Sequence, residues 1–349
     1  MSRLLESLGW KPFFGQQLSL EDLEILHPAR VMEIQRTGLV VCSANGEHQV
    51  NLGGRWFQED AEARPTVGDW VLLGELRDTI ERVLERSSLI KRLSAGTTSD
   101  VQLIAANVDT LFIVSSCNED FNLSRIERYL ALALDAGVRP VIVLTKVDLV
   151  DDHQGLIEQV HTLRSDLVVE GVVATRADTL GNLLPWCASG QTVALLGSSG
   201  VGKSTLVNSL SGEEVQTTAG VREDDGRGRH TTTHRSLHPL ARGGLLLDSP
   251  GMRELGIVDA QAGVGQLFED IDDLSRRCRF SDCAHAQEPG CAVRAAIESS
   301  ELDERRFESY QKLLREEMYN TETIAERHTR SRQFGKMVRQ HLAHSHKKR

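Results

Sequence analysis

The sequence predicts a multidomain protein with an N-terminal β-barrel, a central α/β domain built on a parallel sheet, and a C-terminal helical domain that binds a metal. Three observations support this order. Short alternating segments occupy residues 28–95, apolar strands alternate with helices from residue 101, and cysteine and histidine cluster between residues 278 and 291. With 349 residues and 40% hydrophobic content, the chain can bury more than one core. We place the domains at residues 1–98, 99–262 and 263–349.

The composition narrows the class of protein. There is no apolar run of about 18 residues, and the start of the chain lacks the apolar core of a signal peptide, so we expect a cytoplasmic protein that does not enter a membrane. A formal net charge of −10 argues against a protein that coats nucleic acid by bulk electrostatics. Residues 327–349 nevertheless carry eight Lys or Arg and no acid, so this tail is either an RNA contact or a solvated end.

Turn-forming pairs divide the first domain into short segments. Strands are expected at residues 30–34, 39–42, 48–52 and 70–74, and their alternating pattern predicts a small antiparallel barrel. Residues 86–96 are expected to form a strand that runs into a basic linker.

The central domain has a different pattern, in which apolar strands alternate with helices. Its expected strands are residues 110–115, 140–145, 167–174 and 192–196, and its expected helices are residues 123–136 and 155–164. Because these strands are continuous apolar runs, they predict a parallel sheet covered on both faces.

A phosphate-binding loop follows the strand that ends at residue 196 and precedes a helix expected at 205–210. Backbone N–H groups of such a loop wrap phosphates, Lys203 offsets the charge of the outer two, and the Ser204 hydroxyl can ligate Mg²⁺. Lys203 is therefore also a candidate catalytic residue. The candidate nucleotide-binding residues of this segment are Gly197, Ser198, Ser199, Gly200, Val201, Gly202, Lys203, Ser204 and Thr205.

Two later segments have the composition of nucleotide-sensing switches. An apolar strand ends in Asp248-Ser-Pro-Gly251, where Asp248 would lie near Mg²⁺ and the Gly251 N–H would sense the γ-phosphate. Residues 226–235 are basic and threonine-rich, as expected of a segment that orders around Mg²⁺ and the γ-phosphate, although the same composition suits a solvated loop. Either Thr232 or Thr233 would supply a second hydroxyl to Mg²⁺.

A base-reading motif, Thr145-Lys146-Val147-Asp148, ends the strand at residues 140–144. The Asp148 carboxylate can accept the two adjacent donors of guanine, which adenine lacks. Thr145 stands where an Asn is more usual, which predicts one lost amide contact. Because the base reader precedes the phosphate loop and the two switches follow, the motif order predicts a circularly permuted P-loop GTPase domain, whose second switch leads directly into the C-terminal domain.

The C-terminal cluster contains Cys278, Cys283, His285 and Cys291. Three thiolates and one imidazole complete a tetrahedral shell with no open position, which predicts one structural Zn²⁺ rather than a catalytic ion. Helices are expected after the cluster, at residues 294–297 and 304–318.

Together these motifs resemble those of the ribosome small subunit-dependent GTPase A family, also called RsgA, YjeQ or EngC. The resemblance covers nearly the whole chain and adds residues 65–71 of the barrel and the Arg-Arg-Phe-Glu-Ser-Tyr motif at 305–310. It implies an N-terminal OB-fold, a circularly permuted GTPase and a C-terminal zinc domain. It also implies that GTP and Mg²⁺ are bound, and that hydrolysis is stimulated by the small (30S) ribosomal subunit and its rRNA during late maturation and is coupled to release. We expect a monomer.

The resemblance makes His230 the candidate for orienting the attacking water, because Met252 occupies the position where many GTPases carry Gln. In so basic a loop His230 also suits a contact to RNA phosphate. Two other functions stay open: a nucleotide switch that acts on another RNA, and a non-catalytic nucleotide-binding module. Asp148 argues against a P-loop ATPase or nucleotide kinase.

Overall fold

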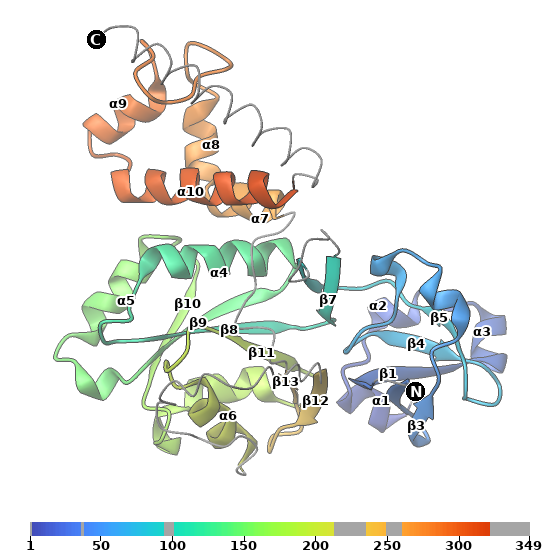
Figure 1. The fold of residues 1–349 in the computed structure, drawn as a ribbon. Coiled ribbons are helices and arrows are strands. Elements are labelled where there is room, and N and C mark those ends of the chain that lie inside the picture. The colour runs from blue at the N-terminus through green and yellow to red at the C-terminus, as the bar shows by residue number, and fades with distance from the viewer. Residues whose placement is uncertain (1, 36–37, 94–100, 213–234, 249–259, 322–349) are drawn as a thin grey trace, which may run out of the picture.

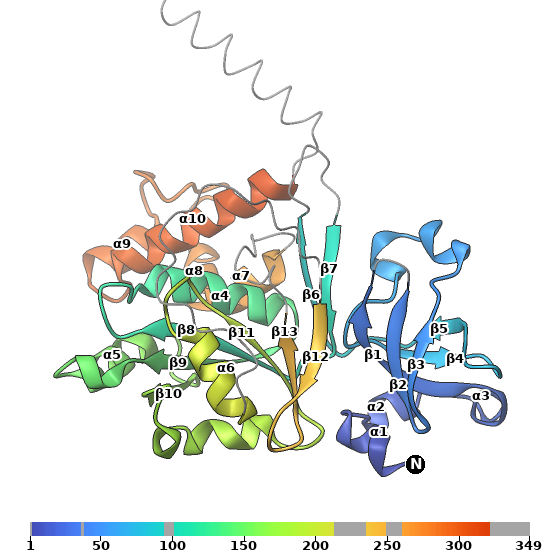
Figure 2. The same ribbon diagram turned by 60° about the horizontal axis from the view of Figure 1, so that its bottom comes forward.

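The computed structural model describes residues 2–35, 38–93, 101–212, 235–248 and 260–321. Its N-terminal part holds three short helices, α1 (Arg3–Ser7), α2 (Pro12–Gly15) and α3 (Leu20–Ile25), followed by five strands. The strands are β1 (His27–Ile34), β2 (Leu39–Ser43), β3 (Gly46–Val50), β4 (Trp70–Leu73) and β5 (Ile80–Val83). All their pairings are antiparallel, as predicted, in the order β3-β2-β1-β4-β5 (Figures 1 and 2).

A hairpin connects the N-terminal sheet with the α/β domain. Strand β6 (Leu89–Leu93) lies within the predicted strand-and-linker segment, and β7 (Val101–Ala106) returns antiparallel beside it. The pairing of β7 was not predicted. The proposed boundary at residues 98 and 99 falls between these two strands, outside the described residues.

The predicted parallel sheet is present. Its strands are β8 (Thr110–Ser116), β9 (Arg139–Thr145), β10 (Val168–Val172), β11 (Thr192–Leu196), β12 (Arg235–Pro239) and β13 (Leu245–Asp248). The order is β10-β9-β8-β11-β13-β12, and every pairing except β12 with β13 is parallel. Helices α4 (Leu123–Asp135) and α5 (His153–His161) cover one face, and α6 (Lys203–Ser211) covers the other (Figure 1).

Alternate residues of the central strands enter two separate cores. Leu111 and Ile113 of β8 pack in the core beneath α4, whereas Phe112 and Val114 pack in the core beneath α6. This two-sided burial explains why the strands are continuous apolar runs in the sequence.

Strand β12 connects the N-terminal strands with the parallel strands, and the sequence did not predict it. One edge pairs with β13, and the other pairs with β1 through Glu33 with Ser236 and Ile34 with Arg235. The N-terminal strands and the parallel strands therefore belong to one 11-stranded sheet.

The C-terminal helices are α7 (Gln261–Leu267), α8 (Glu269–Ser275), α9 (Ala292–Glu298) and α10 (Glu304–Thr321). Helices α7 and α10 pack on α4, on the side away from the sheet (Figures 1 and 2). A Cβ at Gly263 would come within 2.0 Å of the Ala131 carbonyl oxygen, so α7 and α4 touch backbone to backbone. The proposed boundary at residues 262 and 263 thus falls within α7. No helix among the described residues is long and apolar enough to span a bilayer.

Candidate functional site

The phosphate loop runs from the end of β11 to the first turn of α6, as predicted. Gly200 and Gly202 have φ angles of 82° and 95°, which side-chain-bearing residues rarely adopt. A Cβ at Gly197 would lie 2.3 Å from the Val114 carbonyl oxygen. The glycines are therefore required by the backbone path of the loop and by its close approach to β8.

Lys203 begins α6 and folds back over the loop. Its ammonium group donates hydrogen bonds to the carbonyl oxygens of Gly197, at 2.8 Å, and of Ser198. Ser204 and Thr205 follow in the same helical turn, and all three side chains are partly buried. This arrangement places a cation and two hydroxyl-bearing residues at the start of the helix that follows the loop.

The base-reading motif is bonded directly to the phosphate loop. Thr145, with no exposed surface, donates from Oγ1 to the Val201 carbonyl oxygen at 2.6 Å, and Lys146 Nζ donates to the Gly200 carbonyl oxygen at 3.0 Å. A threonine in place of asparagine predicts a lost contact, but its hydroxyl makes this bond between the two motifs. Two segments about 55 residues apart in the chain thereby form one site.

Asp148 lies in a short 3-10 turn, Val147–Leu149, and is exposed. The loop that follows β10 stands beside it: the carboxylate of Asp178, with a further contribution from Asp148, raises the pKa of Arg176. Ser209 of α6 donates to the Ala174 carbonyl oxygen at 2.6 Å, which ties this loop to the helix of the phosphate loop.

Asp248 ends β13, one residue beyond the pair formed by Leu247 and Ala194 of β11. It therefore lies at the same edge of the sheet as the phosphate loop. The other predicted switch residues, His230, Thr232, Thr233 and Gly251, lie outside the described residues.

Two side chains beside the phosphate loop were missed by the sequence interpretation. Asp120 and Arg125 lie within 2.6 and 2.7 Å of Ser198 Oγ, respectively, and 2.6 Å from each other. Asp120 lies between β8 and α4, and Arg125 lies in the first turn of α4. Both precede Ser198 by more than 70 residues, in a part of the chain with no recognisable motif. The chain offered no local signal for this contact.

The predicted metal ligands come together. Their four ligand atoms, from Cys278, Cys283, His285 and Cys291, lie within 4.8 Å of one another. The Sγ atoms of Cys278 and Cys291 are 3.9 Å apart, and His285 Nδ1 lies 3.6 and 3.5 Å from them. Such a cluster can hold one metal ion.

Hydrogen bonds around the cluster orient His285 and favour the thiolate form of Cys278. Ser275 Oγ donates to the Ile271 carbonyl oxygen at 2.9 Å, so its lone pair can accept from His285 Nε2 at 3.2 Å and leave Nδ1 as the ligand. Although partial burial acts in the opposite direction, backbone N–H groups of Val293 and Ala292 lower the pKa of the Cys278 thiol.

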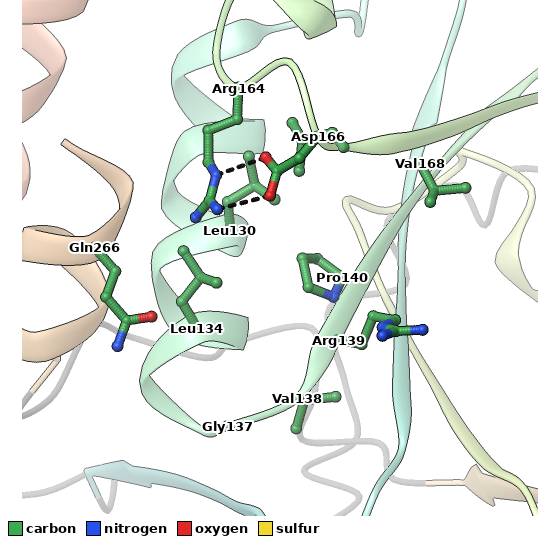
Figure 3. Close-up of a pocket in the computed structure, with 11 residues that line it drawn as sticks. Leu130, Leu134, Gly137, Val138, Arg139, Pro140, Arg164, Asp166, Val168 and Gln266 are labelled. Carbon is green, nitrogen blue, oxygen red and sulfur yellow. Dashed lines mark hydrogen bonds and ion pairs between the residues drawn. The ribbon is translucent and has the colours of Figure 1, made fainter. Parts of the chain in front are cut away.

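A pocket of about 540 Å³ lies elsewhere, between α4, α7 and the first residues of β9 and β10 (Figure 3). Its walls include Leu130, Leu134, Pro140 and Gln266, and its charged pair is already matched, because Arg164 donates to both carboxylate oxygens of Asp166 at 2.9 and 2.8 Å. The phosphate loop lies instead at the opposite, carboxyl edge of the strands, where ligands of such sheets generally bind.

The strand order, with a base reader before the phosphate loop and Asp248 after it, defines a circularly permuted P-loop GTPase. The family model described as RsgA GTPase matches residues 83–258. The chain belongs to the RsgA GTPase family, and it is a GTP-hydrolysing enzyme. A model of ABC transporters also matches residues 186–343, a range that begins just before the phosphate loop, but it covers less than half of the chain.

Two relatives each match more than nine-tenths of the chain. "Small ribosomal subunit biogenesis GTPase RsgA 2" from Vibrio parahaemolyticus is 52% identical, with 99% of this chain and 95% of the relative covered. "Small ribosomal subunit biogenesis GTPase RsgA" from Mesorhizobium japonicum is 45% identical, with 91% of each covered.

Two solved structures have a similar fold. The crystal structure of YjeQ from Thermotoga maritima has a TM-score of 0.61 at 26% identity and covers 83% of this chain and 98% of its own. YloQ, described as a circularly permuted GTPase, has a TM-score of 0.60 and covers 85% of this chain and 96% of its own. Since YloQ is 22% identical, its similarity concerns the fold alone.

Proposed function

We propose that this chain binds GTP with Mg²⁺ at the phosphate loop, and that it hydrolyses GTP during the late maturation of the small ribosomal subunit. The observation that carries this proposal is the pair of hydrogen bonds from Thr145 and Lys146 to the phosphate loop. Through them one nucleotide can meet the base reader and the loop at once. The names of the relatives support the small subunit as the partner.

Each site residue has a proposed task. Asp148 accepts the two donors of the guanine edge, and its exposure leaves the carboxylate accessible to a base. Lys203 leaves the loop carbonyl oxygens and donates to the phosphates, while Ser204 and Asp248 hold Mg²⁺ directly or through water. The bound Mg²⁺ neutralises charge that develops on the phosphate oxygens.

The switch residues complete the proposal. Thr232 or Thr233 supplies a second hydroxyl to Mg²⁺, the Gly251 N–H senses the γ-phosphate, and His230 orients the attacking water. Hydrolysis is stimulated by the small subunit and is coupled to release from it. His230 as an RNA contact is the alternative for this residue.

We further propose that the cysteine and histidine cluster holds one structural Zn²⁺. A tetrahedral Zn²⁺ with Zn–S distances of about 2.3 Å and Zn–N distances of about 2.0 Å would separate two sulfurs by about 3.8 Å and a sulfur from a nitrogen by about 3.5 Å. The distances of 3.9, 3.6 and 3.5 Å fit these values.

The remaining parts of the proposal concern the whole chain. Residues 1–98 form an OB-fold with its N-terminal extension, 99–262 form the GTPase domain, and 263–349 form the zinc domain with its basic tail. The barrel and the basic segments contact rRNA. The protein acts in the cytoplasm as a monomer.

The test is phosphate release from GTP and from ATP, measured alone and with purified small subunits, large subunits or tRNA. Strong stimulation of GTP hydrolysis by small subunits alone supports the proposal. Stimulation by a different RNA would favour the alternative of a switch acting elsewhere, and nucleotide binding with no turnover under any condition would favour a non-catalytic module.

A further inference from the structure

A closed triangle of hydrogen bonds lies beside the phosphate loop. Ser198 Oγ donates to Asp120 Oδ2 at 2.6 Å and accepts from Arg125 Nη1 at 2.7 Å. The same Arg125 nitrogen donates to Asp120 Oδ1 at 2.6 Å. One serine of the loop is therefore bonded to a carboxylate and a guanidinium from another part of the domain.

The two outer members of the triangle are themselves anchored. Asn122 caps α4 and accepts from the backbone N–H of Arg125 at 2.9 Å. The backbone N–H of Asp120 donates to Asn118 Oδ1 at 3.1 Å, and that oxygen also accepts from Ser116 of β8 at 2.6 Å. The end of β8 and the first turn of α4 thus form a fixed support against which Ser198 is held.

Charge and burial indicate what this support can do. Arg125 and Asp120 retain 34% and 31% of their side-chain exposure, and their charges cancel. Partial burial alone would raise the pKa of Asp120, but hydrogen bonds from Ser198 and Arg125 lower it, so the carboxylate stays ionised at neutral pH. A neutral pair adds little net field at the phosphates, so its effect must pass through the geometry of Ser198.

We propose that Arg125 and Asp120 are positioning residues that hold the phosphate loop in its binding shape through the hydroxyl of Ser198. The inference rests on the proposed placement of the GTP phosphates in this loop.

The position of Lys203 explains why such a support is needed. Its ammonium bonds to the Ser198 carbonyl oxygen, so Ser198 is held both through its carbonyl and through its side chain. When the Lys203 ammonium donates to phosphates instead, the Ser198 carbonyl oxygen loses this hydrogen bond, but the triangle around the Ser198 hydroxyl remains. A loop that keeps its shape binds a nucleotide without a further entropic cost of ordering the loop.

The experiment is a double-mutant cycle on the full chain, with GDP and GTP affinity read by a fluorescent analogue and with KM and kcat read from phosphate release. Arg125→Ala should raise the Kd for both nucleotides and the KM by about tenfold, the usual value of a charge-assisted hydrogen bond, and should leave kcat within about twofold. In a Ser198→Ala background the same change should add less than about twofold. Arg125→Lys, which keeps a donor, should restore part of the affinity.

Arg128→Ala is the matched control, because Arg128 lies one turn along α4, is similarly exposed and pairs with Glu316 on α10, away from the loop. Equal effects of Arg125→Ala and Arg128→Ala would overturn the proposal, as would an undiminished effect of Arg125→Ala in the Ser198→Ala background. Lys203→Ala separates the two levels of inference. If Lys203→Ala binds nucleotide normally, the phosphate placement itself fails; if it loses binding while Arg125→Ala does not, only the positioning role fails.

Discussion

Single side chains join segments that are far apart in the sequence. The hydroxyl of Thr145 is buried and bonds to the Val201 carbonyl oxygen, and the next residue, Lys146, bonds to Gly200. Lys146 has a φ of 59°, a left-handed conformation that turns the chain sharply between β9 and Asp148. The position of the base reader relative to the phosphates therefore depends on two short contacts.

Thr145→Val tests the first of these contacts. Valine keeps the shape of the side chain but leaves the Val201 carbonyl oxygen without its donor, and an unsatisfied buried acceptor costs about 1–3 kcal/mol of stability. Because this bond positions the base reader relative to the phosphate loop, we expect the Kd for GDP to rise about tenfold or more. Titration with a fluorescent GDP analogue measures it. Thr145→Asn, which supplies an amide donor, should retain most of the affinity. An unchanged Kd in a normally folded Thr145→Val protein would refute the role.

Among the elements, α4 is enclosed on two sides, by the sheet and by the C-terminal helices. Its Glu127 has no exposed surface and accepts from Arg305 at 3.0 Å and from Arg306 at 3.5 Å. Arg306 also pairs with Asp270 of α8 at 2.9 Å. The Arg-Arg pair of the 305–310 motif thus fastens α10 to both α4 and α8.

Glu127→Gln should strongly destabilise the attachment of α10 to α4. Removing one partner of a buried ion pair costs about 3–5 kcal/mol. Because Arg305 keeps Asp303 at 3.5 Å and Arg306 keeps Asp270 at 2.9 Å, we expect a loss near the lower end of this range. Chemical denaturation should show the loss in free energy of unfolding. Asp273→Asn, which breaks an exposed pair with Arg276, should cost less than about 0.5 kcal/mol. Similar losses in the free energy of unfolding in the two variants would argue against a stabilising role of Glu127 between α4 and α10.

The metal cluster can be tested by replacing one of its thiol side chains. We expect about one zinc per chain, and Cys291→Ser should reduce it to near zero, because it replaces a thiolate that also caps α9. Metal analysis and circular dichroism measure the ion and the accompanying loss of helix. Cys187→Ala is the control, since burial raises the pKa of that thiol to about 12 and it lies in a different core. Retention of zinc by Cys291→Ser would contradict the assignment.

The N-terminal strands and the parallel strands are held together by one shared sheet and by a buried arginine where they meet. Arg30 is 1% exposed and donates to carbonyl oxygens of Leu8, of Gly68 at 3.3 Å and of Asn107 at 3.0 Å. Burial lowers the pKa of Arg30 to about 10, so it remains cationic at pH 7. Its three acceptors lie at the end of α1, just before β4 and just after β7.

Arg30→Met should loosen this junction. Methionine fills part of the volume but leaves the buried carbonyl oxygens of Leu8 and Asn107 without a donor, whereas that of Gly68 keeps Asn107 Nδ2 at 3.0 Å. We therefore expect the free energy of unfolding to fall by about 2–6 kcal/mol. A lower melting temperature and faster proteolysis near residues 9 and 68 should accompany it, with GDP affinity little changed. Arg276→Met, at an exposed side chain, should melt like the parent protein. A melting temperature equal to that of the parent would rule out the proposed role of Arg30.

Much of the architecture could be predicted from local patterns. Apolar runs identified β8, β9 and β11 because a strand buried on both faces needs apolar residues at every position. The phosphate loop and the metal cluster were recognisable because their functional atoms come from residues close together in the chain. The permuted order of motifs followed from the sequence alone.

Tertiary structure decided the rest. Strand β12, with Arg, His and Pro among its five residues, has little strand propensity of its own and forms because two neighbours supply its hydrogen bonds. Asp120 and Arg125 reach Ser198 only because α4 starts where the strand beside β11 ends. Contacts such as these depend on which strands become neighbours, and a one-dimensional pattern does not contain that information. The sequence by itself determined the chemistry of each motif, and the fold determined which distant side chains support it.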